Sequence, residues 1–208
     1  MYSCLIEPHY LPSLAYFRLI SDYDRIYIDV QSKFVKQTYR NRCKILLSNK
    51  VGQLVIPIKH NTLGGGLIDV KIDYSEHWKQ VHWKSIKSAY GKTPFFEHYA
   101  PFFERIYFKE AESLVEFIIE QLELCFKFLG WNKEIVLVNS LEGLDKIPNL
   151  KNQVHSKQSK FDFTSGFYHQ AFGTEFISNL SLIDLLFNIG PESAQFIKNT
   201  VLSTSAKR

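Results

Sequence analysis

The stretch Tyr2-Ser3-Cys4-Leu5-Ile6-Glu7-Pro8-His9-Tyr10-Leu11-Pro12 decides the fold class. Its apolar run ends at Ile6, which is typical of a short buried strand, and a loop with two prolines follows. Pro12 is expected to open a helix, because a proline in the first helical turn lacks only an N–H that would have no partner there. The alternating residues from Arg25 to Val30 predict a second strand. A strand, a helix and another strand in this order predict an α/β fold.

The rest of the chain continues this alternation of strands and helices. Strands are predicted over residues 39–47, 53–58, 67–72 and 134–138, and helices over 75–91, 99–108, 112–129 and 179–190. We therefore expect one α/β domain over residues 1–208, a mixed sheet flanked by helices. A polar irregular loop is predicted at about 146–160, and a frayed C-terminal tail from about residue 200.

Composition excludes several classes of protein. The 208 residues carry a formal charge of +4 and 15% aromatic residues, a balance that does not indicate disorder. No apolar run approaches the length of about 18 residues that a membrane span needs, and the first residues lack the pattern of a signal peptide. The three cysteines have no C-x-x-C spacing, so neither a disulfide framework nor a zinc site is indicated. We expect a cytoplasmic protein with reduced thiols.

The first candidate for chemistry is the loop that holds His9 and Tyr10. Ligands of open α/β sheets bind at the carboxyl ends of the strands, where this loop is expected to lie. The helix N-terminus behind it would favour an anion. His9 would serve as a general acid or base, because histidine titrates near neutral pH. The alternative is a rigid turn whose His9 and Tyr10 side chains are hydrogen-bonded to nearby backbone.

The second candidate is the basic stretch 33–44, in which five of twelve residues are basic and none is acidic. On a strand, Arg40, Arg42 and Lys44 would share one face. Guanidinium groups placed in this way suit bidentate binding of phosphate or carboxylate. The alternative is an edge strand whose charges prevent pairing with other sheets. The predicted phosphate-binding residues of this stretch are Lys36, Arg40, Asn41 and Arg42.

The helices supply further candidates. His77 and His82 are five residues apart, so they do not lie above one another as a metal-binding pair would, and no metal site is expected. His82 lies on an apolar face, where a core histidine is the alternative to a ligand-binding one. Asp184 and Asn188 are four residues apart on a leucine-rich helix. Pairing of Asp184 with Arg40 or Arg42, or a substrate-binding role, would offset the cost of burying its charge.

Four blocks of the chain resemble the WbqC-like protein family and appear in the family's order. The blocks are His9-Tyr10-Leu11-Pro12 with Ala15-Tyr16-Phe17, Lys36-Gln37-Thr38-Tyr39-Arg40-Asn41-Arg42, His82-Trp83-Lys84-Ser85-Ile86 with Ala89-Tyr90 and Pro94-Phe95-Phe96, and Asn179-Leu180-Ser181 through Asn188-Ile189-Gly190-Pro191-Glu192. They cover nearly the whole chain. The first block departs from the common form, because Glu7-Pro8-His9 stands where His-Gln-Pro is usual.

The resemblance implies a bacterial cytoplasmic α/β domain from the biosynthesis of O-antigen lipopolysaccharide or other surface polysaccharides. By analogy, it also implies a relation to nucleotide-binding α/β folds. The family brings no settled reaction, catalytic residue or cofactor with it, so the cofactor stays unknown, and the sequence does not determine the oligomeric state.

Our leading hypothesis is a transferase that acts on a phosphate-bearing precursor such as a nucleotide-activated sugar. Arg40 and Arg42 would bind the phosphates, His9 would act as the acid or base, and Asp184 would orient His9 or a hydroxyl. Further substrate contacts are predicted at Tyr10, His82, Trp83, Tyr90 and Asn188. The alternative is a non-catalytic module that holds a glycan precursor or a protein. Nucleic acid on the basic stretch is a third interpretation, against which the acidic stretch 97–123 argues.

Overall fold

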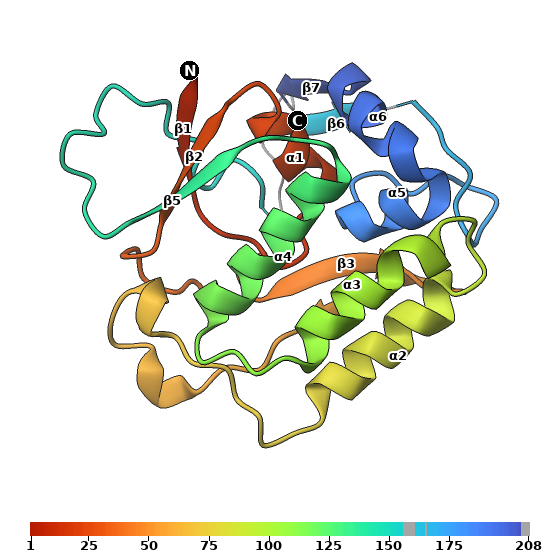
Figure 1. Cartoon of the computed structure of the whole chain (residues 1–208), viewed down its shortest axis with the longest axis horizontal. Coiled ribbons are helices and arrows are strands. Elements are labelled where there is room, and N and C mark those ends of the chain that lie inside the picture. Colours follow the sequence, from red (N-terminus) through yellow and green to blue (C-terminus); the bar gives the residue numbers. More distant parts are fainter. Residues whose placement is uncertain (156–160, 165, 205–208) are drawn as a thin grey trace.

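A computed structural model describes residues 1–155, 161–164 and 166–204 of the chain. It is a single α/β domain in which a parallel sheet and two antiparallel strand pairs are flanked by helices (Figure 1), which confirms the predicted fold class. The strands are β1 (Ser3–Ile6), β2 (Arg25–Asp29), β3 (Arg42–Leu46), β4 (Val51–Val55), β5 (Glu134–Val138), β6 (Phe161–Thr164) and β7 (Val201–Thr204). The α-helices are α1 (Leu14–Ile20), α2 (Trp78–Tyr90), α3 (Phe96–Phe108), α4 (Leu114–Phe128), α5 (Leu182–Ile189) and α6 (Ser193–Asn199). Within the described ranges, no helix is long and apolar enough to cross a membrane.

The parallel sheet has the order β1-β2-β5. Cys4 lies opposite Ile26 and Ile6 opposite Ile28, and these four side chains belong to the buried core. The core also contains side chains of α1 and α4, which meet where the Phe17 and Phe126 rings pack edge to face at 6.3 Å. Because the three strands are parallel, their carboxyl ends meet at one edge of the sheet.

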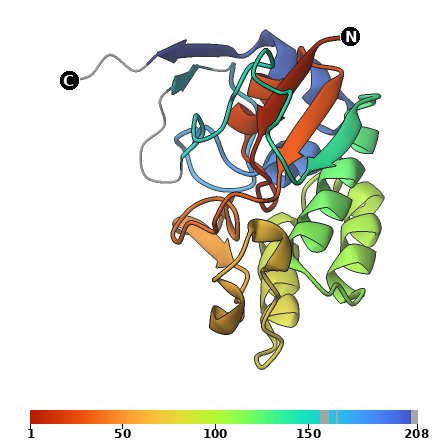
Figure 2. The same cartoon turned by 90° about the vertical axis from the view of Figure 1, so that its left-hand side faces the viewer.

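The second half of the domain is helical. Helix α3 contacts α2, α4 and α5, and the Phe103 ring packs between Phe128 of α4 and Phe187 of α5. The β3–β4 hairpin lies beside α2, where the Leu46 amide donates to the Tyr90 hydroxyl at 3.0 Å. Figures 1 and 2 show the three-stranded sheet and this helical half as neighbouring parts of one body.

Three predicted elements were wrong at their boundaries or in their type. The strand predicted from Tyr39 begins at Arg42, because a turn precedes it in which Gln37 has a φ of 61° and the Thr38 hydroxyl donates to the Val35 carbonyl. The strand predicted over 67–72 is instead a 3-10 helix at 67–69 followed by isolated bridges. In the tail expected to fray from residue 200, residues 201–204 form β7, which pairs with β6, and residues 205–208 are not among the described ones.

The loop predicted at 146–160 extends the parallel sheet. The Leu5 amide donates to the Pro148 carbonyl, and the Leu150 amide donates to the Leu5 carbonyl, so residues 148–150 cover the outer edge of β1. A sheet edge left unpaired exposes backbone donors and acceptors. The backbone of this polar segment pairs with those of Leu5. Residues 156–160 of this loop lie outside the described ones.

Helices α1 and α5 cap each other at their N-termini. The Leu14 amide donates to the Leu180 carbonyl at 3.0 Å. In return, the Leu182 amide donates to the Pro12 carbonyl at 2.9 Å. The Asn179 side chain accepts the next amide of α1, also at 2.9 Å. Amides that a helix start leaves without partners are therefore satisfied by the other helix.

Replacement of Asn179 tests this mutual capping. Asn179 has a φ of 56°, which an alanine tolerates poorly, so Asn179→Ala loses both the cap bond and the favoured backbone. We expect the free energy of unfolding in urea to fall by about 2 kcal/mol. Asn179→Gly, which loses only the side-chain bond, should cost clearly less. Equal losses in the two variants would contradict this explanation.

Candidate functional site

The carboxyl edge of the parallel sheet holds a buried group of charged residues. Glu7 follows β1 directly, and Asp29 is the last residue of β2. His9 and Arg40 lie on loops beside them, and none of the four residues is more than 3% exposed. His9 therefore lies at the strand ends, where the sequence predicted a ligand.

His9 and Glu7 form a pair. The Nε2 atom of His9 lies 3.4 Å from the Glu7 Oε1 atom, and the rings of Tyr16 and Tyr39 pack at 4.8 and 5.4 Å from the imidazole. Burial lowers the pKa of His9 although Glu7 acts against it, so the ring is neutral near pH 7. A carboxylate beside Nε2 favours the proton on that nitrogen. The other nitrogen, Nδ1, is buried and has no hydrogen-bond partner among the described residues.

Arg40 is a buried cation that has no bonded partner among the described residues. Within the part of the chain that the structure describes, no hydrogen bond or ion pair reaches its guanidinium group, and Nε is fully buried. Burial lowers the pKa of Arg40, which the charges of Glu7 and Asp29 oppose. Because β3 begins only at Arg42, Arg40 does not share a strand face with Arg42 and Lys44 as predicted. The turn before β3 directs Arg40 inward instead.

Residues 148–152, which we call the closing segment, cover this charged group. Lys151 Nζ lies 2.6 Å from the Asp29 Oδ2 atom, and the Asn152 amide donates to both Glu7 carboxylate oxygens at 3.0 and 3.1 Å. Burial raises the pKa of Asp29, but the Lys151 bond and nearby amides outweigh it and leave the pKa lowered. Burial also raises the pKa of Glu7, but His9 and backbone amides outweigh it and leave the pKa lowered, so both carboxylates are charged and bonded to the closing segment.

The N-terminus of α1 is not available to an anion. Its first amides are bonded to Leu180 and Asn179, as described above, so the expectation that this helix start favours an anion is wrong. The positive charge at the site comes from Arg40 and Lys151 instead.

Tyr10 points away from His9 into a buried polar network. Its hydroxyl lies 3.0 Å from the His82 Nδ1 atom and is also hydrogen-bonded to the Tyr107 hydroxyl. The rings of Trp78 and Phe117 pack around this network. Burial lowers the pKa of His82 to about 4, so His82 is a neutral core residue.

Asp184 belongs to a different group from His9 and Arg40. It is fully buried, and its Oδ2 atom accepts hydrogen bonds from the Tyr168 hydroxyl at 2.5 Å and the Gln170 amide at 3.0 Å. The Tyr90 hydroxyl also interacts with it. Burial raises the pKa of Asp184. The predicted pairing of Asp184 with Arg40 or Arg42 is therefore wrong, because neutral donors from residues 168 and 170 replace the arginines.

Among the described residues, none of the remaining predicted ones is hydrogen-bonded to the charged group. Lys36 is exposed. The Asn41 amide donates to the Ile56 carbonyl at 2.8 Å, and Arg42 contacts the Gln53 side chain at 3.3 Å. Further away, Trp83 donates to Glu104 at 2.7 Å, and the Asn188 amide donates to the carbonyl of Asp184 one turn earlier, also at 2.7 Å. The ligand roles predicted for these five residues stay predictions.

The sequence reasoning missed four residues of the charged group. Glu7 and Asp29 each stand at the end of an apolar strand pattern, a position that could have indicated them. Lys151 and Asn152 have no such signal, because they reach the site from a segment 120 residues or more away in the chain. The described residues contain no group of three His, Cys, Asp or Glu side chains that could hold a metal ion.

Acidification tests the buried state of His82. Between pH 6.5, the usual pKa of histidine, and about 4, the unfolded chain binds a proton at residue 82 that the folded chain does not bind. The free energy of unfolding should therefore fall as the pH is lowered through this window, by about 3 kcal/mol from His82 alone. In His82→Gln, the free energy of unfolding, measured with urea at each pH, should fall less over this pH window. His77→Gln, at an exposed position directly before the same helix, is the control and should behave like the unaltered protein.

Comparison with known proteins shows which family the chain belongs to. The sequence profile described as "WbqC-like protein family" matches residues 7–165, more than half of the chain. A curated protein of Mycobacterium tuberculosis, "Uncharacterized protein Rv1507c", is 22% identical to this chain over 229 residues. The alignment covers 93% of this chain and 96% of that protein. No solved structure matches the chain, and the expected relation to nucleotide-binding folds stays a prediction. The matched region contains Glu7, His9, Arg40 and Lys151, and the chain belongs to the WbqC-like protein family.

Proposed function

We propose that this protein is a transferase for a phosphate-bearing precursor, such as a nucleotide-activated sugar, and that it binds the phosphate at the carboxyl edge of the β1-β2-β5 sheet. One observation carries the proposal: Arg40 is buried, and no hydrogen bond or ion pair joins its guanidinium group to a described residue. Taking a guanidinium charge out of water without a hydrogen-bonded partner is costly. A phosphate would supply the missing acceptors, because its oxygens match the donor geometry of arginine.

His9 supports a catalytic role beside that phosphate. Its neutral ring, with Glu7 at Nε2, leaves Nδ1 as the basic atom. In the proposed reaction, an acceptor hydroxyl gives its proton to Nδ1 while its oxygen forms a bond to the sugar carbon. The bond between that carbon and the phosphate oxygen breaks, and its electron pair stays on the phosphate. Arg40 binds the departing phosphate. Glu7 stabilises the imidazolium that forms.

Access to the site requires movement of the closing segment. His9 and Arg40 are buried, and the closing segment is fixed at Glu7 and Asp29 by polar contacts of its Asn152 amide and Lys151 ammonium. Asn152 has a φ of 60°, a conformation in which the chain turns sharply. An arriving phosphate competes with Asp29 for Lys151, because both are anions. The closing segment is therefore the part of the site that we expect to open.

Thermal denaturation with added ligands tests the proposal. Pyrophosphate, UDP-glucose and glucose 1-phosphate are the probes, each with and without magnesium. A ligand at 100 times its dissociation constant stabilises the fold by about 2.7 kcal/mol, so a bound probe raises the melting temperature. Arg40→Gln should abolish the rise. Arg25→Gln is the matched control and should keep the rise, because Arg25 lies at the start of β2, at the opposite edge of the sheet, and pairs with Glu134.

The variants also separate an enzyme from a binding module. With a probe that binds, His9→Gln should keep the rise in melting temperature but lose transfer or hydrolysis of the sugar phosphate. Binding without turnover in the unaltered protein would favour the non-catalytic module. If no probe binds, or if Arg40→Gln binds as well as the unaltered protein, the phosphate site is refuted.

Lys151→Gln tests the closing segment. Loss of the ion pair with Asp29 should make amide hydrogen exchange of residues 150–152 about tenfold faster, which corresponds to about 1.4 kcal/mol of opening free energy. Lys146→Gln is the control, since Lys146 is exposed in the same loop. Equal exchange in the unaltered protein and in Lys151→Gln would show that the ion pair does not hold the segment.

A further inference from the structure

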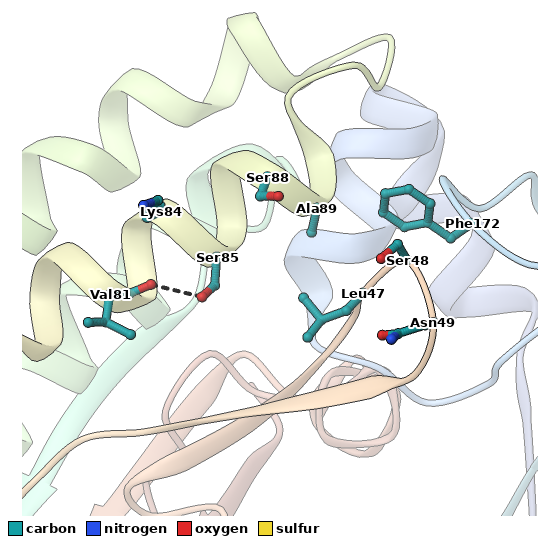
Figure 3. A pocket seen from close by; sticks show the side chains of 9 residues that line it. All are labelled: Leu47, Ser48, Asn49, Val81, Lys84, Ser85, Ser88, Ala89 and Phe172. Atoms are coloured by element: carbon teal, nitrogen blue, oxygen red, sulfur yellow. Dashed lines mark hydrogen bonds between the residues drawn. The ribbon is translucent and has the colours of Figure 1, made fainter.

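A second site lies outside the charged group, between α2, the turn of the β3–β4 hairpin and the loop 166–177. Three cavities of about 390, 270 and 300 Å³ adjoin one another there, and Phe172 lines all of them. Figure 3 shows the largest, with α2 along one side and the hairpin turn and the Phe172 ring on the other. We call the three together the Phe172 groove. None of the residues of the phosphate site lines it.

The groove combines uncharged hydrogen-bonding groups with aromatic rings. Its hydroxyl and amide side chains include Ser48, Asn49, Ser85, Ser88 and Thr174. Two lysines, at positions 50 and 84, and Glu175 leave it with little net charge. Phe172 is half-buried, and the Phe167 ring at one end, which is 83% exposed, packs edge to face on Phe176 at 5.3 Å.

The loop 166–177, which forms one wall of the groove, is held in place by hydrogen bonds on the side that faces the core. It contains no helix or strand, but the Gln170 side chain exchanges two hydrogen bonds of 2.9 Å with the Ile177 backbone. Gln170 and Tyr168 are in turn bonded to the buried Asp184 carboxylate. A buried carboxylate is costly, and here two of its hydrogen bonds fix a surface loop. The wall of the groove is thus formed before any ligand arrives.

We propose that the Phe172 groove binds a saccharide chain. Aromatic rings pack against the C–H faces of sugar rings, while neutral hydroxyl and amide groups exchange hydrogen bonds with sugar hydroxyls. Nucleic acid would require a basic groove. A peptide added as a strand would require an open strand edge, whereas these walls are mainly a helix, a turn and a loop. The groove stands independently of the phosphate site and extends the protein's chemistry to a second ligand.

Amide chemical shifts of the full ¹⁵N-labelled chain test this proposal. The probes are glucose, N-acetylglucosamine, maltotetraose and chitotetraose. We expect shifts at residues 48–50, 85–89 and 172–175, and a tetrasaccharide should bind more tightly than its monosaccharide because the cavities adjoin. Phe172→Ala should weaken binding about tenfold, and Phe172→Tyr should retain it. Phe102→Ala, at an exposed phenylalanine of α3, is the control and should bind normally.

A second variant tests the groove without altering the loop that contains Phe172. Ser88 is exposed on α2, so Ser88→Trp should fold and fill the largest cavity, which abolishes binding. Absence of shifts in the groove with all four saccharides overturns the proposal, as does full binding by both Phe172→Ala and Ser88→Trp. Melting temperatures with pyrophosphate, measured on the same samples, report on the phosphate site alone. Failure of either site is therefore recognised separately.

Discussion

The mutual capping of α1 and α5 joins the two ends of the sequence beside the loop that holds His9. Two backbone hydrogen bonds and the Asn179 side chain join residues 12–15 to residues 179–182, which lie at opposite ends of the sequence. The contact fixes the start of α5 against the start of α1. It also consumes the amides at the start of α1, so the loop before that helix cannot use them for a ligand. The chemistry of this loop therefore depends on side chains.

Within that loop, two neighbouring residues serve different parts of the molecule. His9 faces Glu7 and the charge of Arg40, whereas Tyr10 enters the network of His82 and Tyr107. A rigid loop of this kind connects the carboxyl edge of the sheet to the helical half without a separate linker. Because Tyr10 is held by two hydrogen bonds in the core, the position of His9 is fixed by packing and not by the loop alone.

The buried polar groups divide into satisfied and unsatisfied ones, and this division guides the functional interpretation. Tyr10 and His82 are bonded to each other, as expected of structural groups. Arg40 and the Nδ1 atom of His9 lack partners among the described residues, and unsatisfied groups of this kind concentrate at functional sites. Asp184 differs from both, since its bonded oxygen fixes the loop at the Phe172 groove. The proposed phosphate site rests on the unpartnered groups, and the proposed saccharide groove rests on the loop that Asp184 holds.

Local patterns in the chain predicted the fold class, the βαβ start, the length of β5, the end of α5 and the family, because these depend on periodicity, on proline and glycine signals and on contiguous motifs. They also predicted His9 at the strand ends. Which side chains meet became known only from the three-dimensional structure. Arg40 turns inward because β3 begins two residues later, Asp184 bonds to Tyr168 and not to an arginine, and Lys151 reaches Asp29 from a distant loop. Such contacts depend on long-range packing of irregular segments, which no local pattern encodes.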